Sequence, residues 1–363
     1  MKNKDIFDAL GGVDDRFVSE AAPKRTDFKK QKPRSAVRWL TAAACLCIAA
    51  AVFLGYWLIS PARLQKIPPS ADGSSGLGAG AQEIIVRDMS EYITGNPWSA
   101  DMNLKRLPVY KNTQSQSYDD MLDNINKVAE KLGVEIKSVT RETMSDSDWV
   151  VSEDSLYAVR AETDIGLISA FATGGVSISF SEPVAGNGTG RDAAEYFVKK
   201  YFSVIGFKNP VLCVTSDYDI NGGESAEYRV FDGSGGDSKK IKSYNFNSVY
   251  FDINENGGLE SIRISSVDGA EKLGNYPIIS YKEAEKLLLG GEYISGSADG
   301  IENGVVTREK IKKVELVYSM DPMDAYFAPC YRFYVELDRS PAVGFKCYGE
   351  FDVSAVNSKY ISK

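Results

Sequence analysis

The sequence predicts an α+β fold, in which helices pack on antiparallel sheets, preceded by one N-terminal transmembrane helix. Three observations support this prediction. One uncharged apolar run, Trp39 to Ile59, has the length that crosses a bilayer as a helix. Three later segments combine an apolar stripe with a helix start or stop signal, which predicts helices. Each of these segments is followed by short runs with the alternating apolar pattern of strands.

The apolar run predicts the topology of the chain. A helix can span the hydrocarbon because it satisfies its own backbone hydrogen bonds. Residues 1–38 carry ten Lys or Arg, whereas Arg63 and Lys66 are the only basic residues soon after the run. By the positive-inside rule, we expect a single-pass protein of the cell membrane with a cytoplasmic N-terminus and an extracellular C-terminal domain. The alternatives are a cleaved signal peptide, which has a shorter lead and a shorter apolar core, and a buried core helix.

The net charge differs on the two sides of the predicted span. The chain has 42 basic and 50 acidic residues, and residues 1–38 hold ten and six of these, which leaves 32 and 44 for the remainder. The outer part is therefore strongly acidic, and this disfavours nucleic acid as a partner. The inner basic segment suits membrane lipid, through anionic headgroups.

The chain has no histidine. This excludes Ser-His-Asp and Cys-His catalysis and histidine metal sites. The sequence also lacks an S-x-x-K pair and a phosphate-binding G-x-x-x-x-G-K-[ST] loop. An enzyme would have to rely on carboxylates alone. We therefore expect a protein without catalytic residues and without a cofactor.

The N-terminal leader has an apolar stripe with no partner in its own segment. Apolar side chains recur every three to four residues, in one helix or in two short helices broken at Gly11-Gly12. So short a segment cannot bury the stripe in a core of its own. The predicted partner-binding residues are Ile6, Phe7, Leu10, Val13 and Phe17. The alternative is a disordered lead that serves only the topology.

The run Ile6 to Pro23 resembles the inner leader of anti-sigma-factor-type membrane proteins of clostridial and related Gram-positive bacteria. The resemblance covers about the first sixth of the chain. It implies that the leader binds a sigma factor, and since there is no histidine and no cytoplasmic cysteine pair, the contact would be a helix in a groove. The zinc-containing class of these proteins is excluded.

Residues 60–82 are rich in Gly, Ser and Pro and predict a linker that contributes no core. The remainder predicts three related α+β units, at 83–182, 183–274 and 275–363. Predicted helices follow Ser117 and end at Gly133, run from Ala193 to Gly206, and follow the Ser280 and Glu283 capping box to end at Gly290. The clearest predicted strands are 156–162, 176–180, 228–231, 249–253, 259–264, 314–318, 331–337 and 345–353.

The third unit, Tyr276 to Lys363, resembles the PepSY-like and YycI-like outer domains of Gram-positive bacteria through its hydrophobic pattern. The resemblance implies a small α+β module with a regulatory role and carries over no catalytic residue.

Two acidic loops match the start of a calcium-binding EF-hand. Asp217, Asp219 and Asn221 form the first, and Asp252, Asn254 and Asn256 the second. Both lack the closing glutamate. Ordinary hairpin turns therefore explain them better, and the first loop stays a weak candidate for a metal site.

Two further residue sets are interpreted as packing. Cys213, Cys330 and Cys347 are expected to be buried free thiols rather than disulfides, because a simple hairpin places the last two on different faces and at different positions. The aromatic residues Tyr326, Phe327, Tyr331, Phe333 and Tyr334 are expected to cover a packed sheet face, the alternative being a sugar-binding platform.

The resulting hypothesis is a membrane-anchored, non-enzymatic regulatory protein. Its leader would bind a sigma factor, and its α+β region would sense an unknown extracellular ligand or protein. The rival hypotheses are a cell-surface binding or inhibitory module with an inert anchor, and a hydrolase that uses only carboxylates.

Overall fold

The structure is a computed structural model that describes residues 64–68, 83–112, 116–143, 156–266, 270–296, 300–319, 325–339, 341 and 343–362. The chain divides into two compact units, Met1–Pro61 and Ala62–Lys363, and the description below concerns the second. The predicted span Trp39–Ile59 and the predicted partner-binding residues of the leader lie outside the described residues. Within the described ranges, no helix is long and apolar enough to cross a membrane.

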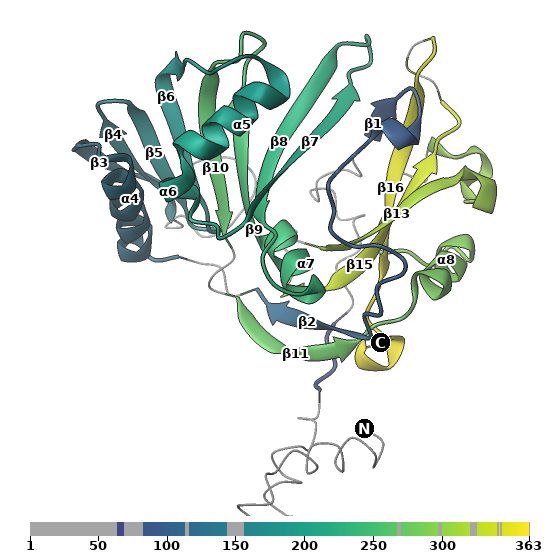
Figure 1. The fold of residues 1–363 in the computed structure, drawn as a ribbon. Coiled ribbons are helices and arrows are strands. Elements are labelled where there is room, and N and C mark those ends of the chain that lie inside the picture. Colours follow the sequence, from purple (N-terminus) through teal and green to yellow (C-terminus); the bar gives the residue numbers. More distant parts are fainter. Residues whose placement is uncertain are drawn as a thin grey trace, which may run out of the picture. The chain divides into compact units, whose positions relative to one another are not determined.

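The described part is a mixed α+β fold with antiparallel sheets, as the sequence predicts. It holds five α-helices, which are α4 (Tyr118–Leu132), α5 (Gly190–Lys200), α6 (Phe202–Ile205), α7 (Asp237–Phe246) and α8 (Tyr281–Leu289). Figure 1 shows how these helices and the sheets are arranged.

The largest sheet has eight strands in the order β3-β4-β5-β6-β10-β9-β8-β7. Its strands are β3 (Ile136–Thr143), β4 (Leu156–Thr163), β5 (Gly166–Phe171), β6 (Val176–Val184), β7 (Pro210–Tyr218), β8 (Glu224–Asp232), β9 (Asn247–Ile253) and β10 (Leu259–Ser266). All neighbouring strands that the structure describes here run antiparallel.

A second sheet has the order β1-β16-β15-β13, with β12 also paired to β16. Its strands are β1 (Glu83–Val86), β12 (Ser295–Gly296), β13 (Ile311–Tyr318), β15 (Pro329–Glu336) and β16 (Lys346–Ser354). A third sheet, in the order β11-β2-β14, consists of β2 (Arg106–Lys111), β11 (Glu271–Pro277) and β14 (Tyr326–Phe327).

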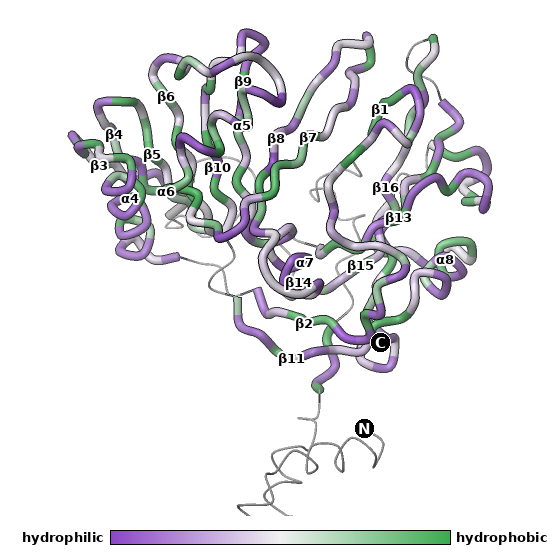
Figure 2. Tube along the Cα trace, viewed as in Figure 1, coloured by the Kyte–Doolittle hydropathy of each residue, from purple (hydrophilic) through white to green (hydrophobic). Residues whose placement is uncertain are grey.

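Helices α4, α5 and α6 cover one face of the eight-stranded sheet (Figure 1). The core between them contains Met121 and Ile125 of α4, Phe197 of α5 and inward residues of the strands such as Val230 and Ile262. Figure 2 shows α4 as mostly hydrophilic with hydrophobic residues at intervals, the pattern of a helix that buries one stripe. Burial of that stripe, rather than helix propensity, is what stabilises such a helix.

Local signals place the ends of two helices where the sequence predicts them. The Ser117 hydroxyl accepts from the backbone N–H of Asp120 while the Asp120 carboxylate accepts from that of Ser117. Ser280 and Glu283 form the same reciprocal capping box before α8. The predicted helix from Ala193 to Gly206 is instead two helices, α5 and α6, that meet at Tyr201.

Both acidic loops are hairpin turns, and the two turns are built alike. In the β7–β8 turn the Asp219 Oδ1 atom accepts from the N–H groups of Asn221 and Gly223, at 2.8 Å each. In the β9–β10 turn the Asn254 Oδ1 atom accepts from Asn256 and Gly258, at 3.1 and 2.9 Å. The glycine at the fourth position has a positive φ in each turn, 86° and 77°, a conformation that residues with a side chain rarely adopt.

The cysteine and aromatic predictions are confirmed for the described residues. Cys213, Cys330 and Cys347 are buried free thiols. The β15–β16 hairpin exists, with Val335 opposite Gly349 rather than opposite Cys347, a shift of two residues that keeps every side chain on its predicted face. Phe327, Tyr331, Phe333 and Tyr334 are almost fully buried, and Tyr326 packs against the core more loosely.

The predicted boundaries between the three units stay predictions, although strand pairing crosses them. Residues 182 and 183 both lie in β6, and residues 274 and 275 both lie in β11. The eight-stranded sheet combines strands from residues 83–182 and 183–274. In the three-stranded sheet, β2 comes from the first predicted unit and β14 from the third, and β11 spans the boundary between the second and the third.

Candidate functional site

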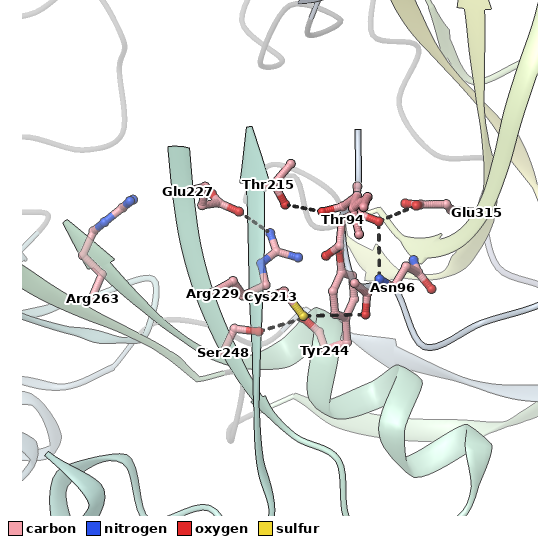
Figure 3. A network of polar contacts seen from close by, with 12 residues as sticks. Thr94, Asn96, Cys213, Thr215, Glu227, Arg229, Tyr244, Ser248, Arg263 and Glu315 are labelled. Atoms are coloured by element: carbon pink, nitrogen blue, oxygen red, sulfur yellow. Dashed lines mark hydrogen bonds and ion pairs between the residues drawn. The ribbon is translucent and has the colours of Figure 1, made fainter. Parts of the chain in front are cut away.

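The segment Tyr92–Asn96, here called the junction segment, connects the two larger sheets (Figure 3). On one side the Thr215 hydroxyl of β7 donates to the Ile93 carbonyl at 3.1 Å. On the other side the Lys313 ammonium of β13 donates to the Tyr92 carbonyl at 2.7 Å. The Asn96 amide donates to the Leu316 carbonyl at 3.1 Å. Because it bonds to both β7 and β13, the junction segment fixes these strands relative to each other.

The centre of the junction segment is tightly enclosed. Thr94 is buried, its hydroxyl donates to the Glu315 carboxylate, and its carbonyl accepts from the Tyr244 hydroxyl at 3.2 Å. Gly95 has a φ of 70°, and a Cβ atom at that position would overlap the Cys213 side chain. Both the backbone conformation and the available space therefore require glycine at this position.

Glu315 is a buried carboxylate whose charge is fully partnered. Besides the Thr94 hydroxyl it accepts from the Tyr334 hydroxyl at 3.0 Å, and the Lys313 ammonium lies 2.8 Å away. A carboxylate in an apolar interior persists only with such partners. Glu315 therefore orders the junction segment through three polar partners, two on Oε1 and one on Oε2.

A second charged cluster lies on the same face of the five-stranded sheet. Arg332 stands in register with Glu315 of β13 and Asp352 of β16. Its Nε and Nη2 atoms each donate to Asp352 at 2.9 Å, and its Nη1 atom lies 2.8 Å from Glu350. Burial raises the pKa of Glu350 to about 7, Arg332 opposes that rise, and the negative Asp352 and Glu315 add to it.

The eight-stranded sheet holds its own partly buried cation, Arg229, in register with Cys213 and Tyr250. The guanidinium lies 4.6 Å from the Tyr244 ring centroid and 4.9 Å from that of Tyr250, and 3.5 Å from Glu227. Burial raises the pKa of the Cys213 thiol, which Arg229 only partly opposes. The thiol is therefore protonated at neutral pH and is a poor nucleophile.

A surface depression of about 600 Å³ borders the junction segment. Its wall mixes aromatic, apolar and charged groups, from η1 (Met89–Glu91), the junction segment and strands β13 and β16. The lining residues are Asp88, Met89, Ser90, Tyr92, Ile93, Thr94, Gly95, Asn96, Trp98, Lys312, Lys313, Val314, Glu315, Lys346 and Tyr348. Lys312 and Lys346 both pair with Glu336, at 3.1 and 3.0 Å. Small-molecule pockets are mostly apolar, and the charged groups of this wall make it more polar than those.

The structure brings together few of the residues that the sequence singles out. Asp219 uses its carboxylate within its own turn, and Asp217 lies in β7 opposite Ser225. The described ranges contain no group of three or more His, Cys, Asp or Glu that could hold a metal ion. Asp217, Asp219 and Asn221 therefore act as turn and strand residues in this structure.

Sequence reasoning missed Thr94, Glu315, Arg332 and Glu350. A signal for the last three exists, because each is a charged residue inside a strongly apolar strand pattern, as in Val-Glu-Leu-Val-Tyr of β13. Charged residues in such strands are almost never fully buried unless they are paired. The junction segment itself carries no comparable signal, because its partners are more than a hundred residues away along the chain.

No known protein family matches the sequence, and no curated protein matches it. Among solved structures there is a distant match to an uncharacterized protein from Eubacterium rectale ATCC 33656, described by a crystal structure at 1.45 Å resolution. The match covers 70% of this chain and 84% of that chain, with a TM-score of 0.30 and 11% sequence identity. The chain is thus similar in structure, at a distance, to a bacterial protein that is itself uncharacterized, and this match assigns no family.

Proposed function

We propose that the chain is a membrane-anchored regulatory protein of the anti-sigma type, with its N-terminus in the cytoplasm and its α+β region outside the cell. One sequence observation carries the proposal. An apolar stripe through Ile6, Leu10 and Phe17, with no core of its own, precedes a basic segment and an apolar run of membrane-spanning length. The leader would bind a sigma factor, and the outer region would respond to an extracellular ligand or protein.

The geometry of the α+β region supports binding rather than catalysis. Glu315 has three polar partners, and the Cys213 thiol is buried with a raised pKa. The depression beside the junction segment offers a mixed wall without an activated nucleophile. This arrangement fits a regulatory module of the PepSY-like or YycI-like kind.

The leader is tested by substitution in the full-length chain. A carboxylate placed in an apolar groove costs several kcal/mol unless it is paired. Phe7→Asp and Phe17→Asp should therefore each abolish recovery of a sigma factor with the purified chain and make transcription from its promoters constitutive. Lys29→Gln together with Lys30→Gln is the matched control, which should leave recovery unchanged. Wild-type chain that recovers no sigma factor would refute the proposal.

The topology is tested separately. A reporter fused after Lys363 should be active only when it lies outside the membrane, and activity in the cytoplasm would reverse the orientation.

A second candidate function is a cell-surface binding module whose anchor is inert. The depression bordered by Tyr92, Ile93 and Trp98 favours it, because this site needs no leader to act. The two candidates separate in the transcription assay, since an inert anchor predicts identical transcription with wild-type, Phe7→Asp and Phe17→Asp chains.

A further inference from the structure

The chain segment that follows the predicted span is docked on the α+β region. Residues 64–68, here called the tether segment, lie within the predicted linker, yet the Ile67 side chain is only 3% exposed. Ile67 packs with Val109 of β2 and Tyr276 of β11 in one apolar cluster. Figure 1 shows the tether segment as a short purple stretch below β11. Its contacts therefore fix where the chain enters the fold.

Hydrogen bonds hold the tether segment to β11 and to the C-terminal end of the described chain. The Ile67 N–H donates to the Tyr360 carbonyl at 2.9 Å, and the Ser362 N–H donates to the Ile67 carbonyl at 2.7 Å. The Tyr276 hydroxyl donates to the Gln65 carbonyl at 3.0 Å. The tether segment is thus bound through its backbone on two sides.

The short connection to the predicted span keeps this docking site close to the bilayer. Four residues, 60–63, separate the end of the apolar run at Ile59 from the tether segment. Because an extended chain covers at most about 3.6 Å per residue, the tether segment begins within roughly 18 Å of the hydrocarbon. Lipid headgroups fill about 5–7 Å of that distance. This step rests on the proposed topology, and it places the face that carries the tether segment next to the headgroups.

The face around the tether segment is basic, although the chain as a whole is acidic. Its exposed cations are Lys66 of the tether segment, Lys105 and Arg106 where β2 begins, and Lys359 of η5 (Ser358–Tyr360). Residues 64–68, 104–107, 275–278 and 355–362 contain these four basic residues and no acidic residue, whereas the whole chain has 42 basic and 50 acidic residues.

Backbone and ladder contacts gather the four cations around one end of β11. Arg106 stands opposite Pro277 in the ladder of β2 and β11. The Asn357 N–H donates to the Pro277 carbonyl at 3.0 Å, which brings the start of η5 to the same place. The tether segment lies there too, because a Cβ atom at Gly274 would be 2.7 Å from the Leu64 side chain.

None of the four cations forms an ion pair with a carboxylate in the described part of the chain. Arg106 donates to the Asn275 carbonyl at 2.9 Å, and the Lys359 ammonium lies 4.9 Å from the ring centroid of the next residue. Lys312 of the second sheet differs, since it pairs with Glu336 at 3.1 Å. The four cations are therefore available to an anionic partner.

The elements next to this face carry balanced charge. At the other end of the three-stranded sheet, Glu271 of β11 stands opposite Lys111 of β2. Helix α8 contains two lysines and two glutamates. The excess of positive charge is thus confined to the end of the sheet that holds the tether segment. Basic side chains attract anionic lipids within about a Debye length, which is about 8–10 Å at physiological salt.

We propose that the face formed by the tether segment, the start of β2, the end of β11 and η5 lies on the outer surface of the cell membrane and binds anionic phospholipid headgroups. Lys66, Lys105, Arg106 and Lys359 contact the headgroup phosphates. These contacts fix the orientation of the α+β region relative to the bilayer. The proposal uses no property of the leader, so it is independent of sigma-factor binding.

The experiment uses the full-length chain in nanodiscs, with a benzophenone amino acid in place of Ser358, an exposed residue next to Lys359. Illumination joins the benzophenone to nearby C–H groups, and mass spectrometry measures the fraction of chains that carry a lipid. Nanodiscs that contain phosphatidylglycerol should give about threefold more lipid adduct than nanodiscs of phosphatidylcholine alone. The same amino acid in place of the exposed Glu255, in the β9–β10 turn, should give little adduct with either lipid.

Two charge variants test the assigned residues. Lys66→Gln combined with Lys105→Gln should remove about half of the excess adduct, because two of the four cations are lost while the surroundings of the probe stay the same. Lys199→Gln combined with Lys200→Gln on α5 removes the same charge elsewhere and should leave the adduct unchanged. All four lysines are exposed, so both variants should keep the wild-type thermal transition.

Four outcomes would overturn the proposal. Equal adduct with both lipids would exclude an electrostatic contact, and an unchanged adduct in the Lys66→Gln, Lys105→Gln variant would exclude the assigned residues. Inorganic phosphate that suppresses the adduct more than chloride at the same ionic strength would indicate a site for phosphate ions instead of a membrane surface. A chain that does not insert into nanodiscs would refute the proposed topology and this proposal together, whereas failure to recover a sigma factor would leave this proposal intact.

Discussion

Arg332 on β15 and Arg229 on β8 are both partly buried, with side chains 28% and 21% exposed, and their charges are held in different ways. Arg332 is bound by carboxylates, with two hydrogen bonds to Asp352 and an ion pair with Glu350. Arg229 lies between the rings of Tyr244 and Tyr250 with one longer ion pair to Glu227. Its Nε atom has no hydrogen-bond partner in the described part of the chain.

The difference follows from what each sheet face packs against. On the five-stranded sheet, three carboxylates, Glu315, Glu350 and Asp352, share a small buried region, so their charges require a fixed cation. On the eight-stranded sheet Arg229 lies next to the rings of Tyr244 and Tyr250. The ring quadrupoles attract the cation, but neutral rings carry no buried charge that would be left unpaired without it. Removing the cation should therefore cost much more at Arg332 than at Arg229.

The largest effect is expected for Arg332→Met. This change keeps the side-chain volume but leaves Asp352 and Glu350 buried without their cation, which should lower the free energy of unfolding by about 3–5 kcal/mol. Denaturant unfolding at neutral pH measures the loss. A triple variant that adds Glu350→Gln and Asp352→Asn should recover most of it. A loss below that of Arg229→Met would contradict the comparison.

The pH dependence of Glu350 sharpens the same comparison. Its pKa rises from 4.5 to about 7 in the folded protein, so between those values the folded state holds a proton that the unfolded state has released. The stabilisation is thus complete below the unfolded pKa and is lost as pH rises through the folded pKa, by at most about 3 kcal/mol. Glu350→Gln should remove this slope. Parallel stability curves for wild type and variant, measured from pH 4 to 8, would show the assignment to be wrong.

Arg229→Met is expected to cost less, about 1 kcal/mol, because its contacts with Tyr244 and Tyr250 are cation–π contacts and its stem still packs. The thermal midpoint and the denaturant midpoint should both fall slightly. Tyr244 keeps its hydrogen bond to the Thr94 carbonyl in this variant, so the junction segment should stay ordered. A loss of unfolding free energy as large as that of Arg332→Met would contradict the view that cation–π contacts with Tyr244 and Tyr250 stabilise the charge of Arg229.

Arg263→Gln gives the smallest expected effect. Arg263 extends the same row, 5.3 Å from the Tyr250 ring and 3.4 Å from Asp252, but its side chain is 57% exposed. Solvent screens such a pair, so the change in unfolding free energy should stay below about 0.5 kcal/mol. Chemical denaturation resolves this difference from the change expected for Arg229→Met.

Local sequence signals predicted the parts of the fold that depend on neighbours along the chain. The capping boxes at Ser117 and Ser280 fix the starts of α4 and α8, and the Asn-Gly turns fix two hairpins. Helix α7 was missed because it follows a glycine-rich run that is typical of a loop. Its stability comes from burying Ile241, Tyr244 and Phe246 against distant strands.

The candidate site could not be predicted for the same reason. The junction segment carries neither an apolar stripe nor a cap or turn signal, and its partners Thr215, Tyr244 and Glu315 come from three other elements. Strand β2 was missed as well, because Pro108 argues against a central strand, although it occupies one between β11 and β14. Both depend on contacts that form only in the complete fold.

Gly95 restricts which residues relatives of this chain can carry at positions 95 and 213. Its positive φ and the Cys213 side chain both exclude a Cβ atom at position 95. In descendants of a common ancestor, a larger residue at position 213 should be tolerated only if position 95 remains glycine. Glycine at 95 and a small residue at 213, which are 118 positions apart, would thus form an evolutionary signature that overall sequence identity does not detect.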